Sequence, residues 1–82
     1  MTANRTTEER VKEVVAKVFH KKVTELSRDT HFVGDLHAKS IQGIELTAVL
    51  EHEFDIEIPG AQARRAKTVG TAVDLIESLL EG

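Results

Sequence analysis

Hydrophobic residues recur at helical spacing near the start of the chain. They occupy positions i, i+3, i+4, i+7 and i+8, namely Val11, Val14, Val15, Val18 and Phe19. This spacing places all of them on one face of a helix. Thr6 and Glu9 stand just before them at the spacing of a capping box, which predicts where this helix begins.

A second stripe at helical spacing lies near the end of the chain and predicts a last helix that begins near Thr68. Its members are Val69, Ala72, Val73, Ile76, Leu79 and Leu80. Between the two stripes, another helix is predicted to start at Ser40 and to run to about Phe54 or Asp55. Pro59 prevents its continuation, and a short helical turn is expected over residues 61–66.

Residues 21–39 show no sustained periodicity, which predicts a long loop, and loops of this length are often functional. We expect its apolar residues to hold it against the core, namely Leu26, Phe32, Val33 and Leu36. The pattern as a whole predicts an all-α protein, a four-helix bundle with three main helices and one short third helix. We expect residues 1–82 to form a single domain.

The middle helix has two apolar faces, of which only one can point into a small core. The larger face carries Leu46, Leu50 and Phe54 and is the better core candidate. Ile41, Ile44 and Ala48 then remain on the opposite side, near acidic residues. An apolar patch with an acidic rim is typical of a docking surface. We predict a partner surface that comprises Asp35, Lys39, Ile41, Ile44, Glu45, Ala48 and Glu51. The alternative is that the long loop covers the patch through Phe32 and Leu36.

Ser40 has two interpretations that are compatible with each other. A serine at the start of a helix is commonly its N-cap. A hydroxyl at that place also suits modification, because the free N–H groups and the dipole of the helix favour a phosphodiester.

The composition excludes several classes of function. The chain of 82 residues has no Cys, Trp or Tyr, so disulfides, thiolate chemistry and aromatic stacking on nucleic acid are not expected. The net charge of −3 also disfavours a nucleic-acid partner. No signal peptide and no apolar run of about 20 residues is visible, so we expect a cytoplasmic protein without a membrane span.

Charge is distributed unevenly along the chain. Residues 1–28 carry a net charge of +3, residues 29–59 a net charge of −6, and residues 60–82 are balanced. A basic partner would therefore be attracted to the middle third. The four histidines have no metal-ligand spacing, so we expect no metal site, and nothing orients a histidine beside Ser40 as a hydrolase requires.

Four stretches of this chain resemble the acyl carrier protein family. They are residues 9–12, residues 32–46 around Ser40, the acidic segment 50–59 and residues 67–74. The resemblance covers nearly the whole chain, with matching spacing between the stretches. It implies a monomeric four-helix bundle that is not an enzyme. It also implies that Ser40 bears a 4′-phosphopantetheine arm.

The resemblance also implies partners. A phosphopantetheinyl transferase would move the arm from coenzyme A onto Ser40, and the terminal thiol of the arm would hold acyl groups as thioesters. Acyl-transferring and acyl-modifying enzymes of fatty-acid, lipid or polyketide synthesis would then receive the cargo. The alternatives are an unmodified carrier-like scaffold that only binds proteins, and an aminoacyl carrier.

The chain departs from the family pattern at several positions. Lys39 stands where the family usually has Asp, Gln42 replaces a common acidic residue, and His37 replaces a common glycine. The short third helix, usually acidic in the family, carries Arg64, Arg65 and Lys67 here. These departures suggest a specialised carrier with partners of its own.

Overall fold

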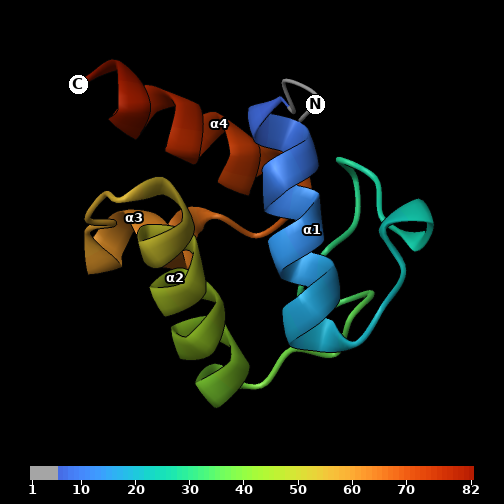
Figure 1. Cartoon of the computed structure of the whole chain (residues 1–82). Helices are drawn as coiled ribbons and strands as arrows, with labels where there is room; N and C mark the ends of the chain where they lie inside the picture. The colour runs from blue at the N-terminus through green and yellow to red at the C-terminus, as the bar shows by residue number, and fades with distance from the viewer. Residues whose placement is uncertain (1–5) are drawn as a thin grey trace.

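The computed structural model describes residues 6–82, so Arg5, which contributes to the positive charge of the first segment, lies outside the described residues. These described residues form four α-helices and one 3₁₀ turn: α1 (Thr7–Phe19), η1 (Val23–Glu25), α2 (Ser40–Phe54), α3 (Gly60–Arg65) and α4 (Val69–Glu81). α1 and α2 lie side by side and run in opposite directions, while α4 crosses one end of the pair (Figure 1). The predicted all-α bundle with a short third helix is confirmed.

α1 begins at the predicted capping box. The Glu9 N–H donates to Thr6 Oγ1 at 3.1 Å, and the Thr6 N–H donates to Glu9 Oε1 at 2.8 Å. All five residues of the predicted stripe are buried. Because β-branched valines are mediocre helix formers, this helix depends on packing of that face against α2 and α4.

One clamp joins α1 to the end of α2. Arg10 Nε lies 3.1 Å from Glu53 Oε2, and an Arg10 Nη2 donor reaches the Glu53 carbonyl oxygen at 2.9 Å. The guanidinium also lies 4.2 Å from the centre of the Phe54 ring. This clamp fixes α2 against α1 at the end that is remote from Ser40.

α4 begins where the sequence predicts, with Thr68 as its N-cap, but its apolar stripe is shorter than predicted. Burial continues only to Ile76; Leu79 is half-buried and Leu80 is 46% exposed. The prediction for Leu80 is therefore wrong. The reason is visible in Figure 1, where the last turns of α4 extend beyond the side of α1.

The long loop is held to the core at several points. Leu26 and Phe32 are buried, Leu36 is half-buried, and the Phe32 ring stacks on Phe19 with centroids 6.2 Å apart. Val33 is 68% exposed, so the prediction that it holds the loop to the core is wrong. It occupies a tight turn stabilised by backbone hydrogen bonds, in which the Asp35 and Leu36 N–H groups both donate to the His31 carbonyl.

The same loop is tied to the start of α4. The Phe32 N–H donates to the Lys67 carbonyl at 3.0 Å, and the Val69 N–H donates to the Thr30 carbonyl at 2.9 Å. Arg28 adds side-chain bonds to Glu8 in α1 and to Asp74 in α4. These bonds fix the middle of the loop, residues 28–32, against the start of α4.

Candidate functional site

Ser40 is the first helical residue of α2 and is not its N-cap, so the N-cap prediction is wrong. The N-cap is Lys39, whose backbone is extended (φ −95°, ψ 164°). The Lys39 N–H donates to Gln42 Oε1 at 2.9 Å, so the Gln42 side chain satisfies the N–H group of the N-cap residue. The Ser40 side chain is exposed, and its hydroxyl makes no hydrogen bond to any residue from 6 to 82.

The surroundings of Ser40 suit a phosphodiester. The Gln42 and Gly43 N–H groups both donate to the Lys39 carbonyl. The Ser40 and Ile41 N–H groups find no acceptor in the described part of the chain, as is usual at a helix start. Unpaired N–H groups and the positive end of the helix dipole favour a negative group at this place. The exposed hydroxyl and these donors therefore fit a phosphopantetheine attached at Ser40.

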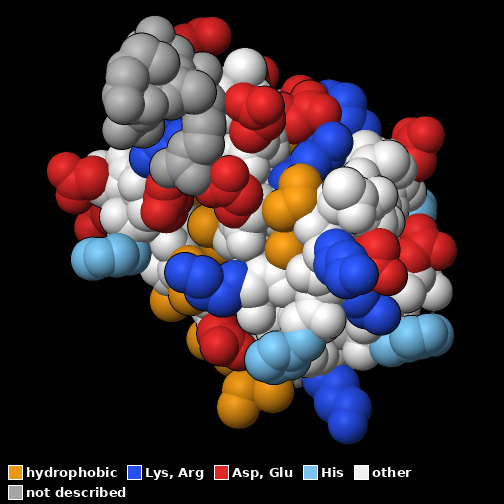
Figure 2. Space-filling model, turned by 45° about the vertical axis from the view of Figure 1, so that its right-hand side comes forward, with side chains coloured by type: hydrophobic (Ala, Val, Ile, Leu, Met, Phe, Trp, Pro, Cys, Tyr) orange, Lys and Arg blue, Asp and Glu red, His pale blue; other side chains and the backbone are white. Residues whose placement is uncertain are grey.

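The two apolar faces of α2 are divided as predicted. Leu46, Leu50 and Phe54 are buried. On the opposite side, Ile41 is 72% exposed, Ile44 is 70% exposed, and Ala48 and Glu45 are exposed as well. The alternative that the long loop covers this side is wrong, because Phe32 turns into the core instead. Figure 2 shows hydrophobic side chains at the lower edge of one face of the molecule and others nearer its middle, with acidic and basic side chains between them.

Two acidic members of the predicted partner surface are bonded to the backbone. Asp35 Oδ2 accepts the His31 N–H at 2.8 Å within the long loop. Glu51 Oε2 accepts the Ile58 N–H at 2.8 Å and so fixes the segment after α2. Both carboxylates shape the loops around the site, a role that the sequence pattern did not indicate. Glu45 keeps an exposed side chain without such a bond to residues 6–82.

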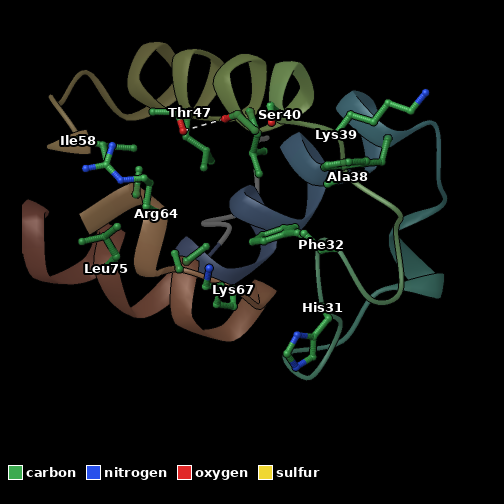
Figure 3. Close-up of a pocket in the computed structure, with 18 of the residues that line it drawn as sticks. His31, Phe32, Ala38, Lys39, Ser40, Thr47, Ile58, Arg64, Lys67 and Leu75 are labelled. Carbon is green, nitrogen blue, oxygen red and sulfur yellow. Dashed lines mark hydrogen bonds between the residues drawn. The ribbon is translucent and has the colours of Figure 1, made fainter. Parts of the chain in front are cut away.

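A cavity of about 380 Å³ opens beside Ser40, between α2, α3 and α4. Its walls are mostly apolar and include Phe32, Leu46, Leu50, Ile58, Leu75 and Ile76. Ser40 lies on the α2 side of the cavity and Arg64 on the α3 side (Figure 3). Lys39 lines the rim, but its ammonium points away from the cavity in this view. Sequence periodicity did not reveal the cavity, because its walls are ordinary core residues of separate helices.

Among residues 6–82, no group of three or more His, Cys, Asp or Glu residues could hold a metal ion. None of the helices in this part of the chain is long and apolar enough to cross a membrane.

Comparisons with known proteins agree with this geometry. Residues 9–76 match the family described as "Phosphopantetheine attachment site". The chain is also 45% identical over 69 residues to an acyl carrier protein of Sulfurovum sp. (strain NBC37-1), a match that covers 84% of this chain and 92% of that protein. Proteins of this kind are carriers and not catalysts, and their cofactor is 4′-phosphopantetheine. The helical bundle, the exposed serine at the start of α2 and these two matches show that the chain belongs to the acyl carrier protein family.

Proposed function

We propose that this protein carries acyl intermediates on a 4′-phosphopantetheine arm attached to Ser40. The observation that supports the proposal most directly is the state of the Ser40 hydroxyl. It is exposed and has no hydrogen-bond partner among residues 6–82. It also does not cap α2, because Lys39 is the N-cap and its N–H donates to Gln42. The terminal thiol of the arm supplies the thioester chemistry that a chain without cysteine lacks.

The residues near Ser40 have distinct roles in this proposal. The first N–H groups of α2 stabilise the negative charge of a phosphodiester. Ile41, Ile44 and Ala48 offer an apolar surface next to the attachment point, and Glu45 adds a negative charge to it. A transferase or an acyl-modifying enzyme that docks there would find Ser40 at the edge of the contact. The cavity beside Ser40 offers an apolar environment in which an acyl chain avoids water.

The cargo, the oligomeric state and the location of the protein are further parts of the proposal. We propose that the cargo is an acyl intermediate of fatty-acid, lipid or polyketide synthesis, passed between acyl-transferring and acyl-modifying enzymes. We also propose that the protein is a monomer of one domain and acts in the cytoplasm. An aminoacyl cargo would use the same arm and the same serine, because the loading enzyme selects the cargo.

Intact-mass measurement tests the proposal. The protein is incubated with coenzyme A and several phosphopantetheinyl transferases, and the mass of the folded product is compared with that of the starting chain. We expect a gain of one phosphopantetheine group. Ser40→Ala should abolish the gain, and Ser78→Ala, which removes another exposed hydroxyl, should not.

The contrary result favours another function. If no transferase modifies the folded wild-type chain, and protein partners captured by it are retained by Ser40→Ala, the carrier proposal fails. The unmodified interaction scaffold then becomes the better explanation. Lys39 next to Ser40 is the feature that favours this second candidate, since a cation there changes which transferase can dock.

A further inference from the structure

Lys39 stands at the end of α2 where a helix least favours a cation. It is the N-cap residue, and the positive end of the helix dipole lies there. Acidic side chains in the first turn could compensate, but the first turn of α2 contains none. The Lys39 side chain makes no capping hydrogen bond either, because an ammonium group has no acceptor. Position 39 therefore carries a residue that weakens the start of its own helix.

The rest of the described chain does not compensate for this charge. Lys39 forms no ion pair with a carboxylate of residues 6–82. Asp35 is the nearest acidic residue before it in the sequence, and its carboxylate accepts the His31 N–H instead. Lys39 is exposed, and Figure 3 shows that its ammonium extends away from the cavity. The cation is thus free to meet a group of another molecule.

The neighbours of Lys39 belong to the surface that surrounds the attachment point. Ser40 follows directly, Ile41 and Ile44 are exposed, and Glu45 is exposed beyond them. Lys39 and Glu45 are about 9 Å apart along the axis of α2. Unpaired surface cations are common and prove little alone. This one contradicts both the capping preference and the dipole of its helix, and such uncompensated exceptions are expected at functional sites.

We propose that Lys39 selects a phosphopantetheinyl transferase that presents a carboxylate beside its active site. The ammonium pairs with this carboxylate while Ile41 and Ile44 contact the transferase, and Ser40 is thereby brought to the active site. Glu45 meets a cation of the same enzyme at the other end of the contact. Opposite charges at the two ends fix the direction in which the partner docks. The inference rests on the proposed modification of Ser40 and adds the charge that the transferase must carry.

Rates of modification with coenzyme A test this inference. Several transferases are compared, and the one with the highest kcat/KM for the wild type is used for the variants. At low salt, Lys39→Asn should lower kcat/KM about fivefold and Lys39→Asp at least about tenfold, with smaller losses at high salt. Lys39→Arg keeps the charge and should stay within about twofold. Arg65→Asn removes a cation from an exposed position of α3 and should also stay within about twofold.

Melting temperatures separate this role from a structural one. Lys39→Asn and Lys39→Asp should melt about 4–8 °C higher than the wild type, because their side chains can cap α2 and suit its dipole. Lys39→Arg should melt like the wild type. Slower modification of a more stable protein cannot result from unfolding.

A charge exchange identifies the partner group. The carboxylates that border the active site of the chosen transferase are replaced by Lys, one at a time. One replacement should restore the modification of Lys39→Asp and slow that of the wild type, since the two substitutions act on the same pair.

Three results would overturn the inference: equal kcat/KM for the wild type and Lys39→Asp, an equal loss in Arg65→Asn, or no transferase replacement that restores modification. A fourth is a melting temperature that rises more on modification of the wild type than of Lys39→Asn, which would assign Lys39 to the phosphodiester of its own chain. If no transferase modifies either the wild type or Lys39→Asp, the carrier proposal fails as well. If both are modified equally well, only this inference fails.

Discussion

The Lys39 N–H donates to Gln42 Oε1 at 2.9 Å, and this bond caps α2 without any contribution from the adjacent serine. The hydroxyl of a serine that caps a helix normally accepts a hydrogen bond from a backbone N–H group. Here the Gln42 amide oxygen accepts the N–H of the N-cap residue instead. The arrangement leaves the Ser40 hydroxyl available for modification beside two N–H groups, those of Ser40 and Ile41, that have no acceptor within residues 6–82.

Gln42→Ala should therefore destabilise the protein, whereas Ser40→Ala should not. Loss of the cap acceptor should lower the free energy of unfolding by about 0.5–1 kcal/mol. Ser40→Ala removes an exposed hydroxyl and should stay within about 0.5 kcal/mol of the wild type. Urea unfolding followed by circular dichroism measures both. A larger loss for Ser40→Ala than for Gln42→Ala would contradict the capping assignment.

Gly43→Ala should stabilise the protein by about 1 kcal/mol, because alanine favours the helical backbone over glycine. Gly43 lies in the first turns of α2, and a Cβ there would meet no atom within 4 Å. The midpoint of urea unfolding should rise at an unchanged slope. A lower midpoint would mean that a methyl group at position 43 collides with neighbouring atoms, contrary to the structure.

Gly70→Ala is the matched contrast in α4. A Cβ there would come within 3.0 Å of the Arg28 carbonyl oxygen, which also accepts the Gly70 N–H at 2.9 Å. The backbone must move to admit a methyl group, so we expect a loss of about 1–3 kcal/mol despite the better helix propensity. Stability equal to that of Gly43→Ala would show that the loop does not approach α4 so closely.

Glu8 should make stability depend on pH in the acid range. Hydrogen bonds from Lys12 and Arg28 lower the pKa of its carboxyl. A lowered folded-state pKa means that the contribution is fully present above about pH 4.3, the ordinary value for Glu, and is lost as pH falls through the lowered value. Glu8→Gln should therefore melt at a lower temperature than the wild type at pH 7.

The difference in melting temperature between Glu8→Gln and the wild type should shrink as pH falls and close at the most acid end of the series. Glu77→Gln, at an exposed helical position of α4, should follow the wild type throughout. A constant gap at every pH would rule out the titration of Glu8 as its cause.

Glu45→Lys should slow the association of a basic partner with the exposed side of α2. A charge at the rim of a contact acts mainly on the association rate, and salt screens it. We expect a severalfold slower modification by a phosphopantetheinyl transferase at low salt, with a smaller difference at high salt. Glu77→Lys, which makes the same charge change on α4, should have little effect. Equal slowing by both variants would mean that net charge, and not this surface, controls the encounter.

Local sequence signals predicted much of the fold correctly. The capping box at Thr6 and Glu9, the valine stripe of α1 and the end of α2 near Asp55 all depend on neighbours within one or two turns. The errors concern positions where residue type alone is a poor guide. Val33 and Leu80 are hydrophobic, but the core ends before it reaches them. Ser40 is a good N-cap residue by type, yet α2 begins one residue earlier than expected, with Lys39 as its N-cap.

The sequence by itself determined the helices, the family and the serine at which the arm is expected. The reason is that helical periodicity, capping residues and the family resemblance depend on residues that are close together in the sequence. Only the tertiary structure decided that the long loop leaves the side of α2 with Ile41 and Ile44 uncovered, since Phe32 packs on Phe19 in the core instead. It also decided that Asp35 and Glu51 hold backbone N–H groups. The cavity with Arg64 at its rim exists only where α2, α3 and α4 meet, since packing of separate segments creates a space that no single segment encodes.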